Sequence, residues 1–144
     1  MVEAVPAGHW ETSTLVQAID AEGVRAAMVL NGPMNAASFA GFCDWLLAPV
    51  LKPGDLLVMD NLSSHKCSAA VDIIEATRAR VVYLPPYSPD LNPIELVFSK
   101  LKQLVRTLKP RAFNELIEAA AHAIRKISPS DIDACFNHCG YVTT

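Results

Sequence analysis

Two short stretches in the middle of the chain decide how the rest is expected to fold. The first is an apolar run that closes on a carboxylate and an amide, Leu56-Leu57-Val58-Met59-Asp60-Asn61. The second is a proline-rich loop that delivers another carboxylate, Leu84-Pro85-Pro86-Tyr87-Ser88-Pro89-Asp90-Leu91-Asn92-Pro93-Ile94-Glu95. The 34 residues between Asp60 and Glu95 are enough for one helix and one strand. A strand-helix-strand unit of this kind brings both carboxylates to one edge of a sheet.

The segments around these stretches support an α/β arrangement. The continuous apolar run 56–59 is typical of a central strand that is covered on both faces. Residues 66–77 have helical spacing, residues 80–84 form the next strand, and the crossover between the two strands makes them parallel. Asn92 is a good N-cap and Pro93 suits the first helical position, so a helix is expected from Pro93 to about residue 107.

The remaining segments predict a hairpin before this unit and helices on either side of it. Residues 1–10 show no periodicity and are interpreted as a lead-in, whereas 12–19 and 24–30 predict two antiparallel strands joined by a turn with a glycine. Residues 35–51 carry apolar side chains at three-and-four spacing, which predicts a helix. Trp10 and Trp45 are expected to be buried or partly buried packing residues. Two further helices are expected over about 111–127 and from Ser128-Pro129 to about His138.

Length and composition favour one cytoplasmic domain. The 144 residues suffice for one domain with a real core. No apolar run reaches the ~18 residues of a membrane span, and the N-terminus lacks the pattern of a secretory signal. The cysteines have no C-x-x-C spacing and are expected to be reduced, buried thiols. A zinc site at Cys135, His138 and Cys139 is disfavoured, because only three ligands cluster there.

The charge distribution is uneven along the chain. The net charge is −3, yet residues 99–111 contain five bases and no acid: Lys100, Lys102, Arg106, Lys109 and Arg111. This run fits a surface that contacts a polyanion, and it fits a solvated helix face equally well. Lys100, Lys102 and Arg106 are the residues best suited to phosphate contacts, which position a nucleic acid without reading its sequence.

Taken singly, the two carboxylates have ordinary explanations. Asp60 suits a strand end that caps a turn, and Glu95 can complete a capping box by accepting a hydrogen bond from the Asn92 N–H. Together at one sheet edge they would repel each other, and a hard divalent cation is the physical means of keeping both ionised. Two such ions activate an attacking hydroxyl and stabilise the leaving oxygen of a phosphodiester. That chemistry usually takes a third carboxylate, and none of the first 59 residues is a convincing one.

These residues resemble a known family. The block 58–65 with Asp60 and His65, the string Tyr87-Ser88-Pro89-Asp90-Leu91-Asn92-Pro93-Ile94-Glu95, and Phe98-Ser99-Lys100-Leu101-Lys102 are similar to the DDE transposases of bacterial insertion sequences related to the mariner group. The resemblance extends from Gly8-His9-Trp10 to Cys139-Gly140-Tyr141, and the spacing between Asp60 and Glu95 matches that of the family's last two acids.

The resemblance implies a fold, a chemistry and roles for individual residues. It implies an RNase H-like α/β fold in which Asp60 and Glu95 are catalytic residues and ligands of Mg²⁺ or Mn²⁺. It implies DNA as the partner, at transposon ends and targets, with a homodimer in the intact enzyme and a bacterial, nucleoid-associated location. The expected DNA contacts are Lys66, Lys100, Lys102 and Arg106. The expected supporting loop residues are Asn61, His65, Tyr87, Asn92 and Pro93.

One departure from the family pattern leads to further expectations. The family's first acid lies on a central strand ahead of the hairpin, and no counterpart was found here, so residues 1–144 are expected to form a partial catalytic domain that lacks this strand and the N-terminal DNA-reading region. Met1 would then be an internal start, or the reading frame a broken insertion sequence. Unpaired strand edges would leave the domain marginally stable, with weak metal binding and no activity alone. The alternatives are a non-catalytic DNA-binding or dimerising remnant and a related RNase H-like nuclease such as a junction resolvase.

Overall fold

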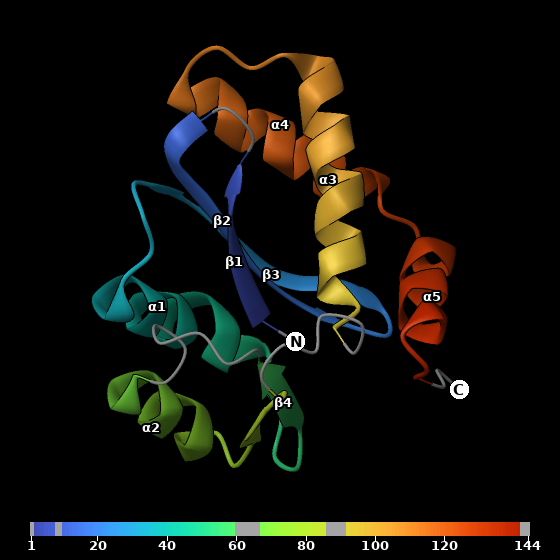
Figure 1. The fold of residues 1–144 in the computed structure, drawn as a ribbon. Coiled ribbons are helices and arrows are strands. Elements are labelled where there is room, and N and C mark those ends of the chain that lie inside the picture. The colour runs from blue at the N-terminus through green and yellow to red at the C-terminus, as the bar shows by residue number, and fades with distance from the viewer. Residues whose placement is uncertain (1, 8–9, 60–66, 86–91, 142–144) are drawn as a thin grey trace.

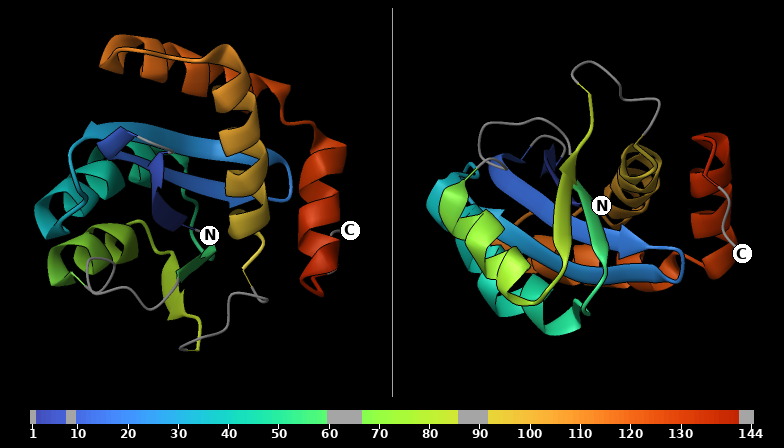
Figure 2. Two further views of the ribbon diagram at one scale, coloured as in Figure 1. Left: turned by 45° about the horizontal axis from the view of Figure 1, so that its top comes forward. Right: turned by 90° about the horizontal axis from the view of Figure 1, so that it is seen from below.

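The fold is built on one mixed sheet with helices on both faces. The computed structural model describes residues 2–7, 10–59, 67–85 and 92–141, and side chains from Ser13 onward within these ranges. In this part of the chain the strand order is β3-β2-β1-β4-β5. Figures 1 and 2 show α1 and α2 on one side of the sheet and α3, α4 and α5 on the other. The expected α/β class is therefore confirmed.

The N-terminal segment corrects one expectation. It is not an unstructured lead-in, because Val2–Ala7 forms strand β1. This strand lies between β2 and β4, antiparallel to β2 and parallel to β4, so the prediction of a sheet without a strand at this position is wrong. The pairing with β4 is confined to Val2 and Met59, whereas β1 pairs with β2 over its whole length. Two open strand edges in mid-sheet are costly, which favours filling the position even with a segment that shows no periodicity.

The hairpin that follows agrees with the sequence. Strands β2 (Trp10–Asp20) and β3 (Gly23–Asn31) are antiparallel. Asp20 closes the turn, since its carboxylate accepts hydrogen bonds from the N–H groups of Glu22 and Gly23 at 2.8 and 3.2 Å. Gly23 has a φ of +147°, which only glycine adopts readily. A turn of this kind fixes the register of the two strands.

One face of the sheet is covered by short helical pieces. These are α1 (Ala36–Phe42), a π-helical turn (Cys43–Leu47), a 3-10 turn (Ala48–Val50) and α2 (Ser68–Ala76). Phe39 and Phe42 are fully buried here and lie 6.4 Å apart between ring centroids. The first core cluster, which gathers on this face, consists of Val16, Ala18, Ala26, Phe39, Phe42, Cys43, Leu47, Leu57, Met59, Ala70, Ile74 and Ala79.

The position of Trp45 around this helical segment corrects one expectation. At about 100° per residue, Trp45 lies about 120° around the helix from the buried Phe39, so helical spacing itself turns it away from the sheet. Trp45 is 80% exposed and Leu46 is exposed as well. The expectation of a packed Trp45 is therefore wrong.

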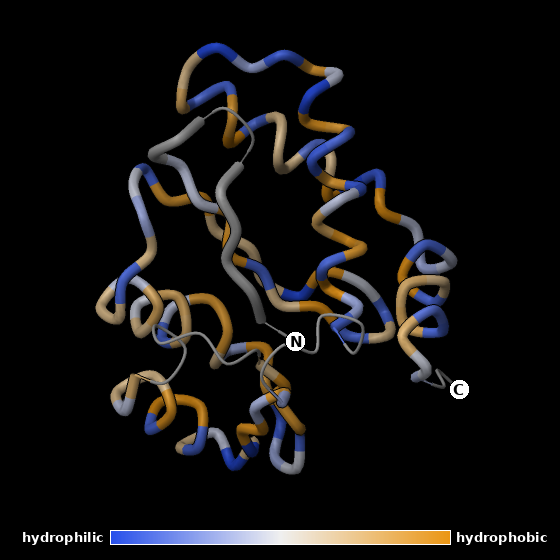
Figure 3. The backbone as a smooth tube through the Cα atoms, viewed as in Figure 1, coloured by the Kyte–Doolittle hydropathy of each residue, from blue (hydrophilic) through white to orange (hydrophobic). Residues whose placement is uncertain are grey.

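The opposite face carries longer amphipathic helices. They are α3 (Ile94–Leu108), α4 (Phe113–Lys126) and α5 (Pro129–His138), close to the predicted bounds. Ser128 caps α5, because its hydroxyl accepts the Asp131 N–H at 3.1 Å. Figure 3 shows hydrophilic residues around the connection from α3 to α4. The second core cluster is Leu15, Ile19, Ile94, Val97, Phe98, Leu101, Ala123 and Ile132.

The predicted strand-helix-strand unit is present. Strands β4 (Leu56–Met59) and β5 (Arg80–Tyr83) are parallel and in register, from Leu56 opposite Arg80 to Met59 opposite Tyr83. The helix between them, α2, packs on the sheet through Ala70 and Ile74. Among the described helices, none is long and apolar enough to cross a membrane.

Candidate active site

The candidate site lies where β4 and β5 end. The N–H of Leu84, just after β5, donates a hydrogen bond of 2.7 Å to the carbonyl oxygen of Met59, the last residue of β4. The two strands therefore end side by side. Asp60 comes directly after Met59 in the sequence but lies outside the described residues, as do Asn61, His65, Lys66 and Tyr87.

Glu95 is held in place by the start of α3. Asn92 is buried and its side-chain oxygen accepts the Ile94 N–H at 3.3 Å, while the Glu95 N–H donates to the Asn92 carbonyl at 3.2 Å. Pro93 occupies the N-cap position, one residue later than expected for Asn92. Ile94, Val97 and Phe98 anchor this turn in the second core cluster. Asn92 and Pro93 thus both shape the turn that presents Glu95, and their supporting role in catalysis stays a prediction.

The Glu95 carboxylate is available for an external partner. The residue is half-buried in the first turn of α3, where the helix dipole favours a negative charge. Within the described ranges its carboxylate forms no hydrogen bond or ion pair, so the capping-box alternative is not realised there. By contrast, the Glu115 carboxylate at the start of α4 accepts the N–H groups of Arg111 and Ala112, at 2.6 and 3.3 Å.

A carboxylate in this position fits a hard divalent cation, since Mg²⁺ and Mn²⁺ prefer oxygen ligands. It is not a metal centre by itself. Among the described residues no group of three or more histidine, cysteine, aspartate or glutamate side chains is arranged to hold a metal ion. In this part of the chain Glu95 is therefore not a member of a complete group of metal ligands.

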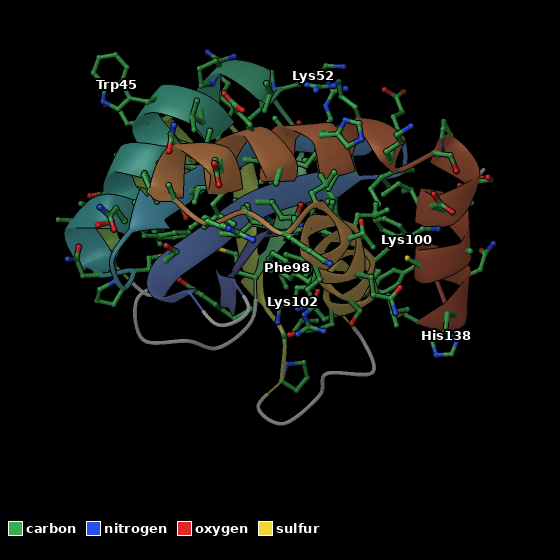
Figure 4. All side chains as sticks on the ribbon, turned by 90° about the horizontal axis from the view of Figure 1, so that it is seen from above. Trp45, Lys52, Phe98, Lys100, Lys102 and His138 are labelled. Carbon is green, nitrogen blue, oxygen red and sulfur yellow. The ribbon has the colours of Figure 1, made fainter. Side chains whose placement is uncertain are left out.

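The three basic residues predicted on α3 divide between two sides of the helix. Lys100 forms an ion pair with Asp131 of α5, with 2.5 Å between Nζ and Oδ1. Lys102 and Arg106 form no ion pair with any described residue. Figure 4 shows Lys100 on the side of α3 that faces α5 and Lys102 on another side. Lys100 is therefore already neutralised, and Lys102 and Arg106 are not.

The partners of Asp131 show how firmly this ion pair is integrated. The hydrogen bond from Lys100, followed by those from the backbone and hydroxyl of Ser128, lowers the pKa of the Asp131 carboxyl from 3.8 to about 2. The same carboxylate accepts the Ser128 N–H at 2.9 Å. The Lys100 pair thus links α3 to the cap of α5.

The expectation for the cysteines is confirmed in part. All four are free thiols, but Cys43 alone is buried, whereas Cys67, Cys135 and Cys139 are partly exposed. Cys43 is buried, and this burial together with the nearby Cys67 raises the pKa of its thiol to about 12, so it stays neutral. Burial also raises the pKa of Tyr83 at the end of β5, again with a contribution from Cys67. Cys67 and Tyr83 both pack against the first core cluster.

Two polar residues near the sheet centre, Gln17 and Glu3, were not identified from the sequence as candidate site residues. Gln17 of β2 is fully buried, and neither its side-chain oxygen nor its nitrogen has a hydrogen-bond partner in the described structure. Its neighbour across the strand pair is Glu3, the one acid of β1, which follows Val2 and its partner Met59. The two-residue period of a strand places Gln17 on the same face as Leu15 and Ile19, which could have identified it as an inward-facing polar residue. No sequence signal marked Glu3, because β1 itself was not expected.

Comparisons with known proteins support the same fold and family. The family model described as DDE superfamily endonuclease matches residues 2–117. The crystal structure of the catalytic domain of Mos1 mariner transposase superposes with a TM-score of 0.63 at 17% identity, covering 100% of this chain and 82% of that one. A structure of that catalytic domain with Raltegravir and Mn gives a TM-score of 0.61 at 16% identity, covering 100% and 82%.

The Mos1 strand transfer complex gives a TM-score of 0.62 at 21% identity, covering 92% of this chain but only 44% of that one. This chain thus spans less than half the length of the Mos1 chain in that complex. No curated protein matches the sequence. At these identities the structural matches establish a common RNase H-like fold.

Proposed function

Because the chain belongs to the DDE superfamily of endonucleases, we propose that it is the catalytic domain of a mariner-related insertion-sequence transposase, which cleaves and joins DNA at transposon ends. The observation that supports this proposal is the position of the Glu95 carboxylate at the start of α3. This unpaired carboxylate is fixed by the buried first turn of α3. The chain reaches this turn from the end of β5, beside the strand end that leads into Asp60.

In this proposal Asp60 and Glu95 are the catalytic residues and the ligands of Mg²⁺ or Mn²⁺. Structures of the Mos1 catalytic domain have been determined with Mn and with Mg. A bound divalent ion would activate the attacking oxygen and stabilise the leaving oxygen of the phosphodiester. The first attack is by water, and the second, which transfers the strand, is by the freed 3′ hydroxyl. Both displacements are in line at phosphorus, so the chain's task is to hold the carboxylates and the DNA in fixed positions.

The third carboxylate that this chemistry usually takes is not identified in the site. No motif of this sequence supplies it, and Glu3 is the one acid of the strand beside β4. We therefore expect weak metal binding and slow, metal-dependent nicking by residues 1–144 alone. The variant Glu3→Gln tests whether β1 contributes a ligand.

Transposon-end DNA, target DNA and a second copy of the chain are the proposed partners. The Mos1 matches include a strand transfer complex, a pre-cleavage transpososome and a paired-end complex with the left transposon end. For this chain such an assembly would place the protein on bacterial chromosomal DNA.

A nicking assay combined with a gel shift tests the proposal. Plasmid and labelled duplex DNA are incubated with the purified chain with Mg²⁺, with Mn²⁺ or with EDTA. Metal-dependent nicking that disappears in Asp60→Asn and Glu95→Gln supports a catalytic domain. Nicking that survives both substitutions contradicts it.

The two alternatives give different results in the same experiment. DNA binding without nicking in either metal, by the chain and by its Asp60→Asn variant alike, favours a non-catalytic remnant. Strong preference for branched over linear duplexes favours a resolvase of the same fold.

A further inference from the structure

We propose that one side of α3 forms a track for the phosphates of a DNA strand that leads away from the candidate site. The track consists of Lys102 and Arg106, aligned with Glu95, and it excludes Lys100. This inference rests on the proposed function, because it assumes that the Glu95 site acts on DNA. It separates Lys102 and Arg106, which contact phosphates, from Lys100, which holds α5 against α3.

Helix geometry separates the three bases. At about 100° per residue, Lys102 and Arg106 lie about 20° to either side of Glu95 around the α3 axis, whereas Lys100 lies about 140° away. Ser99 joins the same side as Glu95, and its hydroxyl donates to the Glu95 carbonyl at 3.2 Å. The side therefore begins at the candidate catalytic acid and continues with two cations.

The distances along α3 suit a nucleic acid strand. With a rise of about 1.5 Å per residue, Lys102 is about 10 Å and Arg106 about 16 Å from Glu95 along the axis. Duplex DNA rises about 3.4 Å per nucleotide along its axis, and successive phosphates of one strand lie farther apart because the strand also winds around the axis. The two cations therefore correspond to phosphates at most about three and five nucleotides from the one at Glu95. Their long side chains can adjust to the curvature of the backbone.

Charge identifies the occupant of this side. Arg106 is exposed and Lys102 is half-buried, and neither has a described acidic partner. No acid occurs between Glu95 and Glu115, so the surface complements a polyanion. An acidic protein would also be attracted, but the alignment with a carboxylate that requires a metal ion favours a phosphodiester strand.

The ion pair of Lys100 supports its exclusion from the track. Its ammonium is committed to Asp131, and Figure 4 shows it on the side of α5. A phosphate contact by Lys100 would have to break this pair. Lys100 is therefore assigned to holding α5 against α3.

The salt dependence of DNA binding tests the track. Fluorescence anisotropy of a labelled duplex is measured in EDTA over a series of KCl concentrations, for a transposon-like end sequence and for a scrambled one. Lys102→Gln/Arg106→Gln should reduce the magnitude of the slope of log K against log[KCl] by about 2, equally for both sequences.

Two controls make the result specific. Lys52→Gln/Arg78→Gln removes the same charge beside the beginnings of β4 and β5, at the other end of these strands, and should leave the slope unchanged. Lys100→Gln should leave it unchanged too, while lowering the melting temperature. Equal slopes for the wild type and the Lys102/Arg106 variant overturn the proposal, as does an equal reduction in either control.

The outcome is separable from that of the proposed function. Glu95→Gln should abolish nicking and keep the full slope, because it removes no cation. A chain that shows the slope change but never nicks retains the track and loses the proposed catalysis. A chain that nicks with an unaltered slope in the double variant loses the track alone. Absence of any DNA binding overturns both.

Discussion

The two faces of the sheet differ in how they are built and in what they carry. The face under α1 and α2 is covered by short helical pieces around the stacked rings of Phe39 and Phe42. The face under α3, α4 and α5 is covered by longer amphipathic helices and carries Glu95, the basic track and the ion pair between Lys100 and Asp131. The aromatic face is a packing surface, and in the proposed function the chemistry takes place on the opposite face. Substitutions on the two faces should therefore have different effects. Those on the aromatic face should lower stability, and that of Glu95 on the opposite face should weaken metal binding.

The largest effect is expected on the aromatic face. The side chain of Phe42 is fully buried, with 0% of it exposed to solvent. Phe42→Ala should therefore lower the free energy of unfolding by about 3–5 kcal/mol. Trp45→Ala, three residues later and on the surface, should change it by less than about 0.5 kcal/mol. Urea denaturation of both variants provides the measurement. Comparable losses in the two would contradict the outward position of Trp45.

On the other face, Glu95→Gln should affect metal binding and leave stability intact. Mutation of a residue that only hydrogen-bonds to a metal ligand lowers metal affinity about 10- to 100-fold. Loss of a ligand itself should therefore weaken Mn²⁺ binding at least about a hundredfold. Calorimetric titration with Mn²⁺ measures this, and the melting temperature without metal should stay within a degree or so of the wild type. Unchanged Mn²⁺ affinity would remove Glu95 from the site.

Much of this contrast could be predicted from the sequence, because local patterns determine it. The turn at Asp20 and Gly23, the parallel pair β4 and β5, and the helix that begins beside Glu95 all follow from residues adjacent in the chain. Trp45 was mispredicted because its size suggested packing, although helical spacing places it away from the apolar stripe of Phe39 and Phe42. β1 was missed because its six residues show no alternation that signals a strand, and it is specified by the need for a partner between β2 and β4.

The same limit applies to the candidate site. Glu95 and its proline-rich approach are local features and were identified directly. The ion pair of Lys100 depends on Asp131, 31 residues later, and no sequence spacing indicates that α5 packs beside α3. Helical spacing separates Lys100 from Lys102 and Arg106 around α3, but the side of α3 that faces α5 is known only from the packing.

A smaller effect, opposite in sign, is expected within the second face. Both polar atoms of the Gln17 side chain are buried without a partner in the described structure, which is unfavourable. Gln17→Met keeps the volume and removes the amide, so it should raise the free energy of unfolding by about 1–2 kcal/mol. Chemical denaturation gives the comparison, with Gln103→Met on exposed α3 as a control that should be close to neutral. A destabilised Gln17→Met would indicate a partner for the amide.

The smallest effect concerns the link between α3 and α5, and it depends on pH. The pKa of Asp131 is lowered in the folded protein, so its ion pair stabilises the fold above the ordinary value of 3.8, and this contribution is lost as the pH falls towards about 2. Asp131→Asn should lower the melting temperature slightly at pH 5–7, and the difference from the wild type should fade between pH 4 and 2.

The partner variant provides the check on this assignment. Lys100→Gln should show the same fading difference, and the double variant should be less destabilised than the sum of the two single ones. Strict additivity would mean that the pair contributes nothing as a unit.

The central claim is that Asp60 and Glu95 share one metal ion at the edge where β4 and β5 end. Iron-directed cleavage of the polypeptide tests it directly, because Fe²⁺ can replace Mg²⁺ or Mn²⁺ at oxygen ligands, and ascorbate with peroxide then generates radicals that cut the nearby backbone. We expect cuts beside both residue 60 and residue 95. Excess Mg²⁺ should suppress them, and either Asp60→Asn or Glu95→Gln should abolish both cuts. Cuts at only one of the two positions, or cuts that persist in either variant, would contradict it.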